Sequence, residues 1–149
     1  MKFYDFTQKN CTILSAENQR AVDTACILSN QIKATYRQDL SKAVNTFIIS
    51  DWSPLKLIQL EKFPIMDLTE IYFQLYKSNT LPRGFPTPPQ IAKNFISFVD
   101  NLNIQTKNII LVGNGGSLEA SSYYQNKFIL VNNTKKILDY SQYIELAKN

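Results

Sequence analysis

The run Gly113-Asn114-Gly115-Gly116-Ser117 is the part of this chain whose residue types could do chemistry. It holds three of the chain's four glycines and follows the apolar run Ile109-Ile110-Leu111-Val112. Main-chain N–H groups at such a corner, with the first turn of a following helix, can bind an anion. One hypothesis is therefore a site for a nucleotide or a sugar phosphate, in which Ser117 donates a hydrogen bond. The alternative is a tight strand-to-helix turn, with the glycines at positive φ and Ser117 as the helix cap.

The same run resembles motifs of two known families. The Gly-Asn-Gly-Gly-Ser corner is similar to that of sugar isomerase domains, in which the serine contacts a sugar phosphate, and Ala120 lies near a small-residue position of that pattern. Residues 112–116, with Asn133 downstream, are similar to the nucleotide-binding motif of sialyltransferases, a family that also needs a histidine. Each likeness covers only the stretch around the corner. We interpret both as local convergence on a strand–loop–helix junction.

The residue types that are missing exclude several kinds of catalysis. The chain has no histidine, which excludes Ser-His-Asp and Cys-His catalysis and histidine metal ligands. Two cysteines are too few for the familiar zinc sites. Among the carboxylates, Asp51, Asp67 and Glu70 are the most conspicuous, but helix capping and solubility explain them better than acid–base work does. We expect a protein that is not an enzyme and that needs no metal and no cofactor.

A proline-stiffened loop is the second candidate site. The residues Asn79-Thr80-Leu81-Pro82-Arg83-Gly84-Phe85-Pro86 carry two apolar side chains and one cation between helical patterns. Proline lowers the entropy cost of ordering such a loop, so Leu81, Arg83 and Phe85 could anchor a protein partner. Alternatively, Leu81 and Phe85 fold back onto the domain. The leading hypothesis is a small protein that binds a macromolecule, of the inhibitor, immunity or assembly-factor type.

Nucleic acid is a weaker partner hypothesis. The net charge is +4, from 16 basic and 12 acidic residues, and the basic residues are mostly lysines spread along the chain. Lys127, Lys135 and Lys136 would carry such binding. Aromatic residues lie near basic ones at Tyr123-Tyr124 with Lys127 and at Tyr72-Phe73 with Tyr76-Lys77. Arginine usually dominates nucleic-acid contacts. We therefore expect these lysines to form a solvated surface. The helical spacing of Tyr72 and Tyr76 predicts that both pack in the core.

Length and hydropathy predict a single cytoplasmic domain. A chain of 149 residues is the usual size of one domain. No apolar run approaches the ~18 residues of a membrane-spanning helix, and the first residues lack the apolar core of a secretory signal. Cys11 and Cys26 are then expected to be free thiols in a reducing compartment. No membrane partner is expected.

Helix breakers and caps define the elements of the first hundred residues. Strands are predicted at residues 2–6 and 11–14, and Ser15 is the predicted cap of a helical stretch over 16–50. That stretch forms one helix, or two that break near Thr35-Tyr36, and we favour two. Ser53 with Pro54 predicts a helix start, Pro64 ends that helix, and Asp67 with Glu70 has the form of a capping box.

The last part of the chain predicts strands and helices in alternation. A helix begins at Thr87-Pro88, and a strand covers 108–112. A helix over 116–124 then leads to a strand over 128–131, which we expect to pair in parallel with the first. A last helix carries Ile137, Tyr140, Ile144 and Leu146. The predicted fold is α+β, with a mostly helical N-terminal two-thirds, a C-terminal βαβα unit and a small, partly parallel sheet that recruits residues 2–6 or 11–14.

Overall fold

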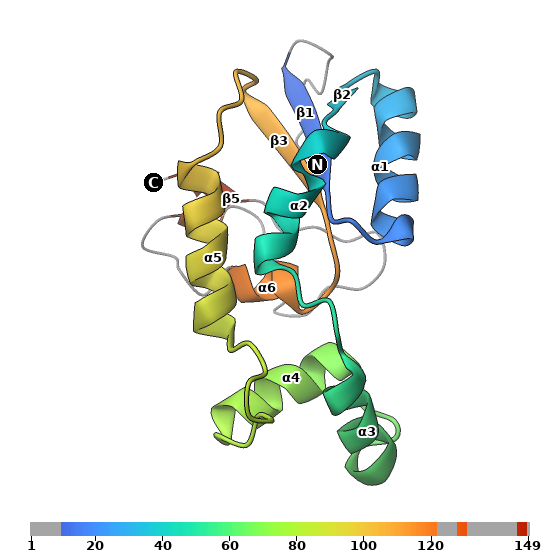
Figure 1. Ribbon diagram of the computed structural model, residues 1–149, viewed down its shortest axis with the longest axis vertical. Coiled ribbons are helices and arrows are strands. Elements are labelled where there is room, and N and C mark those ends of the chain that lie inside the picture. The colour runs from blue at the N-terminus through green and yellow to red at the C-terminus, as the bar shows by residue number, and fades with distance from the viewer. Residues whose placement is uncertain (1–9, 122–127, 131–145, 149) are drawn as a thin grey trace. The chain divides into compact units, whose positions relative to one another are not determined.

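Figure 1 shows the computed structural model, which describes residues 10–121, 128–130 and 146–148. The chain divides into two compact units. The first unit comprises Met1–Ile48 and Phe98–Asn114, and the second comprises Ile49–Ser97 and Gly115–Asn149. The fold is α+β with a small parallel sheet, as the sequence predicted. The single domain expected from the chain length stays a prediction.

The first unit is built on three parallel strands. They are β1 (Cys11–Ser15), β2 (Thr35–Tyr36) and β3 (Asn108–Val112), in the order β2-β1-β3. The pairing of β1 with β3 runs from Cys11 opposite Asn108 to Ser15 opposite Val112. All five residues of β1 are buried, as expected for the central strand of a sheet that is covered on both faces.

Helix α1 (Gln19–Ile32) connects β1 to β2 and packs beside both strands (Figure 1). Its first turn is capped by Asn18, whose Oδ1 accepts a hydrogen bond from the Ala21 amide at 3.0 Å. The helix ends at Lys33, which has a left-handed φ of 54°. Small residues on its inner face allow close packing, and the core there is formed by Cys11, Ile13, Ala25 and Ala34, with Leu28, Ile32, Tyr36, Ile110 and Val112 against it.

Short helical turns follow β2 in the first unit. They are η1 (Gln38–Leu40), α2 (Ser41–Val44) and η2 (Asn45–Phe47). The ring of Phe47 packs against that of Phe98, with the ring centroids 5.1 Å apart. Phe98 belongs to the last turn of α5 (Pro88–Asp100), a helix whose earlier turns belong to the second unit.

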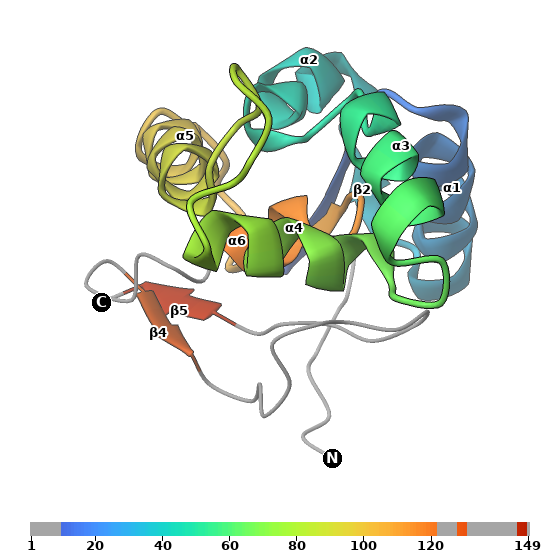
Figure 2. The same cartoon turned by 90° about the horizontal axis from the view of Figure 1, so that it is seen from below.

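The second unit contains the remaining elements. These are α3 (Ser53–Lys62), α4 (Leu68–Lys77), the first turns of α5, α6 (Ser117–Ser121) and an antiparallel pair of β4 (Phe128–Leu130) and β5 (Leu146–Lys148). Figure 2 shows α3 and α4 joined by a tight connection, and β4 beside β5. Pro54 lies in the first turn of α3 and Pro64 follows its end, as predicted. The Asp67 carboxylate caps α4 by accepting from the Thr69 amide at 2.8 Å.

Three aromatic rings form part of the core of the second unit. Trp52 contacts Tyr72 and Phe85 edge-on, with centroids 5.6 and 5.9 Å apart, and Tyr72 lies 5.7 Å from Phe85. Such pairs add about 0.5–1.5 kcal/mol each beyond the burial of their area. The Tyr72 hydroxyl donates to the Pro86 carbonyl at 2.9 Å, so this buried tyrosine has a polar partner. The predicted core position of Tyr72 is confirmed, whereas Tyr76, which was expected in the core as well, is only half-buried.

The expected pairing of strands 108–112 and 128–131 is wrong. β3 pairs with β1, and β4 pairs with β5 in an antiparallel ladder. The reason is that β3 pairs in parallel with all five residues of the buried strand β1. The two strands are far apart in the sequence, so their pairing cannot be inferred from the spacing of residues along the chain. Leu146 lies in β5 rather than in a helix. The other members of that predicted helix, and the strand expected at 2–6, lie outside the described residues.

Helix boundaries differ from the expected ones by a few residues. Ser15 does not cap α1: it ends β1, and its Oγ is hydrogen-bonded to the Tyr36 hydroxyl at 2.7 Å, so the helix begins only after Asn18. The predicted break near Thr35-Tyr36 is confirmed, although those residues form β2. Ser53 is the first residue of α3 and Trp52 is its cap.

Candidate functional site

The loop between α4 and α5, residues 78–87, begins with a hydrogen-bonded helix end. Asn79 adopts a left-handed φ of 57° just after α4. The Thr80 amide donates to the Leu75 carbonyl at 2.8 Å, and the Asn79 amide donates to the Tyr76 carbonyl at 3.0 Å. These two bonds form a Schellman motif, which satisfies the last carbonyls of the helix. The start of the loop is therefore fixed by the main chain of α4.

The middle and the end of the loop are fixed in the same way. The Phe85 amide donates to the Pro82 carbonyl at 3.0 Å, which closes a turn with Gly84 at φ 82°, as the third position of a type II turn requires. Thr87 and Gln90 form a capping box at the start of α5: the Thr87 amide donates to Gln90 Oε1 at 2.8 Å, and the Gln90 amide donates to Thr87 Oγ1 at 3.4 Å.

This loop borders a pocket of about 330 Å³. The volume is at the lower end of the range of small-ligand pockets, so the space suits one or two side chains of a partner. Its lining comes from the end of α4, the loop and the first turn of α5: Tyr76, Asn79, Leu81, Pro82, Gly84, Phe85, Thr87 and Gln90.

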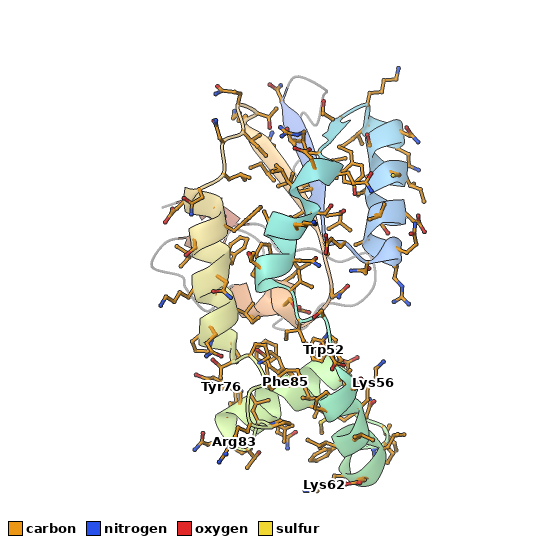
Figure 3. All side chains as sticks on the ribbon, viewed as in Figure 1. Trp52, Lys56, Lys62, Tyr76, Arg83 and Phe85 are labelled. Atoms are coloured by element: carbon orange, nitrogen blue, oxygen red, sulfur yellow. The ribbon has the colours of Figure 1, made fainter. Side chains whose placement is uncertain are left out.

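The three predicted anchors of this loop have different environments. Arg83 is exposed at the tip of the turn, and Leu81 is half-buried in the pocket lining. Phe85 is only 9% exposed because it folds back onto Trp52 and Tyr72. Figure 3 shows Phe85 on the side of Trp52 and Arg83 at the outer end of the loop. Phe85 therefore forms a wall and support of the pocket, whereas Leu81 and Arg83 remain accessible.

The second half of the glycine-rich corner, residues 115–117, lies in the second unit and is packed within it. Gly116 has φ 84°, and a Cβ built on it would lie 2.4 Å from Cη2 of Trp52. The Gly116 amide donates to the carboxylate of Glu119, which is 1% exposed. Buried Ser117 accepts a hydrogen bond on its Oγ from the Ile49 amide at 2.8 Å. Ser117 is thus the first residue of α6 and contacts a distant part of the chain, rather than capping the helix.

The first half of the corner, Gly113 and Asn114, lies in the first unit at the carboxyl end of β3. Asn114 Oδ1 accepts a hydrogen bond from Asn18 Nδ2 at 3.1 Å. β1 ends beside β3, and Glu17 after β1 accepts from Asn45 Nδ2 at 2.9 Å through its carboxylate. The spacing of the sequence missed this polar edge. The pairing of β1 with β3 brings Asn18 near Asn114, and the turn η2 brings Asn45 near Glu17.

Of the candidate carboxylates, Asp67 caps α4 as expected, Glu70 is exposed in the first turn of that helix, and Asp51 lies just before Trp52, the cap residue of α3. Asp51 accepts a hydrogen bond from the Ser53 amide at 2.9 Å. Hydrogen bonds from the Ser53 hydroxyl and amide lower the pKa of Asp51 below its usual value, and Lys56 adds a smaller effect. Both thiols are free, as predicted. Cys11 is buried, which raises the pKa of its thiol, and Cys26 is exposed.

Several candidate positions fall outside the described residues: Tyr123, Tyr124, Lys127, Asn133, Lys135 and Lys136. Within the described part of the chain, no three acidic or cysteine side chains lie close enough together to hold a metal ion. No helix in the described part of the chain is both long and apolar enough to cross a bilayer. A scan against models of known protein families and searches of curated proteins and of solved structures found no match to this chain.

Proposed function

We propose that this protein acts without catalysis, by binding a protein partner through loop 78–87, in the manner of a cytoplasmic inhibitor, immunity protein or assembly factor. The observation that carries the proposal is the combination of a hydrogen-bonded loop and an open pocket. The loop is tied at Thr80, Phe85 and Thr87, and the pocket lies along it.

Preorganisation is what makes this loop suitable for recognition. Binding normally costs free energy because interface loops and side chains must be ordered. Here Pro82 and Pro86 restrict the main chain, and Tyr72 holds the Pro86 carbonyl from α4. A partner therefore meets the main chain at Leu81 and Arg83 in a conformation that is already fixed. Within the loop, the ordering cost that remains is that of the exposed Arg83 side chain.

Affinity purification of the full chain from its native cell tests this proposal. We expect the double variant Leu81→Ala, Arg83→Ala to lose the partner that the wild-type chain retains. Phe85 is left intact because it supports the fold. The matched control is Lys56→Ala, Leu57→Ala on α3, which also removes one exposed cation and one exposed leucine. A partner that is retained by the loop variant, or lost equally by the control, would contradict the proposal.

A second candidate function is the binding of a phosphorylated small ligand at residues 113–117, as a binding module or an enzyme. The strand order favours this candidate. The central strand β1 has β2 on one side and β3 on the other. Open parallel sheets bind ligands at the carboxyl ends of strands whose connections lead to opposite sides in this way. A panel of nucleotides and sugar phosphates should then raise the melting temperature of the wild-type chain, but not that of Gly115→Val. A flat response across the panel would remove this candidate.

A further inference from the structure

The charged residues between Glu70 and Asp100, the stretch of chain that contains the pocket lining, all have the same sign. From residue 71 to residue 99 the chain carries three charged side chains, Lys77, Arg83 and Lys93, and no acidic one. All three are exposed. None of them forms an ion pair with another residue of the described ranges, where Arg37 and Asp39 do form one, with 2.7 Å between Nη2 and Oδ2.

These three cations come from the three elements that line the pocket. Lys77 is the last residue of α4 and follows the lining residue Tyr76. Arg83 stands at the tip of the loop. Lys93 lies one turn along α5 from the lining residue Gln90, on the same face of the helix. Exposed cations on all three elements make the surface that these elements form positive, and a positive surface attracts carboxylates.

From this arrangement we propose that the partner presents an acidic segment, with one apolar side chain in the pocket and flanking carboxylates on Lys77, Arg83 and Lys93. The inference rests on the proposed function and names the class of partner. The pocket provides Leu81, Pro82 and Phe85 for the apolar group. The cations outside it provide the charged contacts.

A free anion fits this pocket less well than an acidic peptide does. The first turn of α5 has few amides to offer: Pro88 and Pro89 lack an N–H, and the Gln90 amide already donates to Thr87. An anion would therefore rely on side chains alone. A nucleic acid is also disfavoured, because the ring of Phe85 is already packed on Trp52 and Tyr72 rather than free to stack on bases.

Selection from a random displayed peptide library against the immobilised full chain tests the inference. We expect the enriched peptides to share one large apolar residue flanked by Asp or Glu. A synthetic copy of an enriched peptide is then titrated while the emission of Trp52, the chain's single tryptophan, is followed, since this ring contacts Phe85 in the pocket wall. Arg83→Glu should weaken binding about five-fold, because an attraction becomes a repulsion.

Matched variants separate the inference from the function on which it rests. Lys62→Glu on α3 makes the same charge change away from the loop, and its affinity should equal that of the wild-type chain (Figure 3). Enriched peptides without net acidity that still lose binding in Leu81→Ala would overturn the acidic partner and leave the binding function standing. No enrichment, or enrichment that neither Leu81→Ala nor Arg83→Glu affects, would overturn both. If a single-stranded oligonucleotide at equal concentration displaces the peptide, the inference that the partner is a protein rather than a nucleic acid would be overturned.

Discussion

Adding one methyl group to each of two adjacent glycines should have very different effects on stability. Gly116 has φ 84°, and its added Cβ would lie 2.4 and 2.8 Å from two ring atoms of Trp52. Gly115 does not have a left-handed φ, and its added Cβ would meet Thr69 Oγ1 at 3.5 Å, an ordinary contact. Gly116→Ala should therefore destabilise the chain strongly, whereas Gly115→Ala should be nearly neutral.

The magnitude follows from two contributions. A left-handed φ costs an alanine about 1–2 kcal/mol relative to glycine. The clash adds about 1–3 kcal/mol, the usual cost of overpacking, since Trp52 cannot swing away freely while it contacts Tyr72 and Phe85. The sum for Gly116→Ala is about 2–5 kcal/mol. Gly84→Ala measures the first contribution by itself, because Gly84 has φ 82° and an added Cβ would meet nothing within 4 Å.

Urea denaturation followed by circular dichroism gives the free energies of unfolding. The order of destabilisation should be Gly116→Ala, then Gly84→Ala, then Gly115→Ala. In a Trp52→Phe background the two ring atoms that clash are absent, so the penalty of Gly116→Ala should fall to that of Gly84→Ala. If Gly116→Ala costs no more than Gly115→Ala, or if Trp52→Phe leaves its penalty unchanged, the packing explanation of this glycine is refuted.

Three further outcomes are expected. Phe85→Ala should cost about 3–5 kcal/mol in urea denaturation, because it removes a buried ring; a loss under 1 kcal/mol would contradict its place in the core. The lowered pKa of Asp51 means that its hydrogen bonds with Ser53 stabilise the fold above the usual aspartate pKa, and that this contribution is lost as the pH falls through the lower, folded value. The free energy of unfolding should therefore fall less between neutral pH and about pH 3 in Asp51→Asn than in the wild-type chain. A thiol reagent should modify Cys26 in the folded protein and Cys11 only after unfolding, which mass spectrometry of the labelled chain checks.

Local rules predicted the helices of the second unit well. Pro54 and Pro64 bound α3, Asp67 caps α4, and α5 begins at Thr87-Pro88. Each of these signals acts within one turn of the chain, so the residues themselves contain the information. The spacing also predicted that the buried face of α4 would include Tyr72, which is fully buried.

Pairing between distant strands could not be predicted in this way. Thr35 and Tyr36 follow α1, and the helical spacing of apolar residues in that helix continues beyond them in the sequence. They form a strand nevertheless, because they pair with Thr12 and Ile13 of β1. A strand of two residues exists only because a neighbouring strand supplies its hydrogen bonds. The same holds for the candidate site. The sequence placed Leu81, Arg83 and Phe85 on one loop, but the packing of Phe85 on Trp52 depends on a residue more than thirty positions away.

The environment of Glu119 explains why the loop is the better candidate than the glycine-rich corner. Corners of this kind bind anions when their N–H groups lack partners within the chain. Here the Gly116 amide donates to the buried Glu119 carboxylate, and Ser117 accepts from Ile49. A phosphate on the Gly116 amide would have to displace that carboxylate, and the loss of a hydrogen bond by a buried polar group is costly. The pocket along loop 78–87 is open, and its cations are exposed, so a partner gains contacts there without breaking any that the fold already uses.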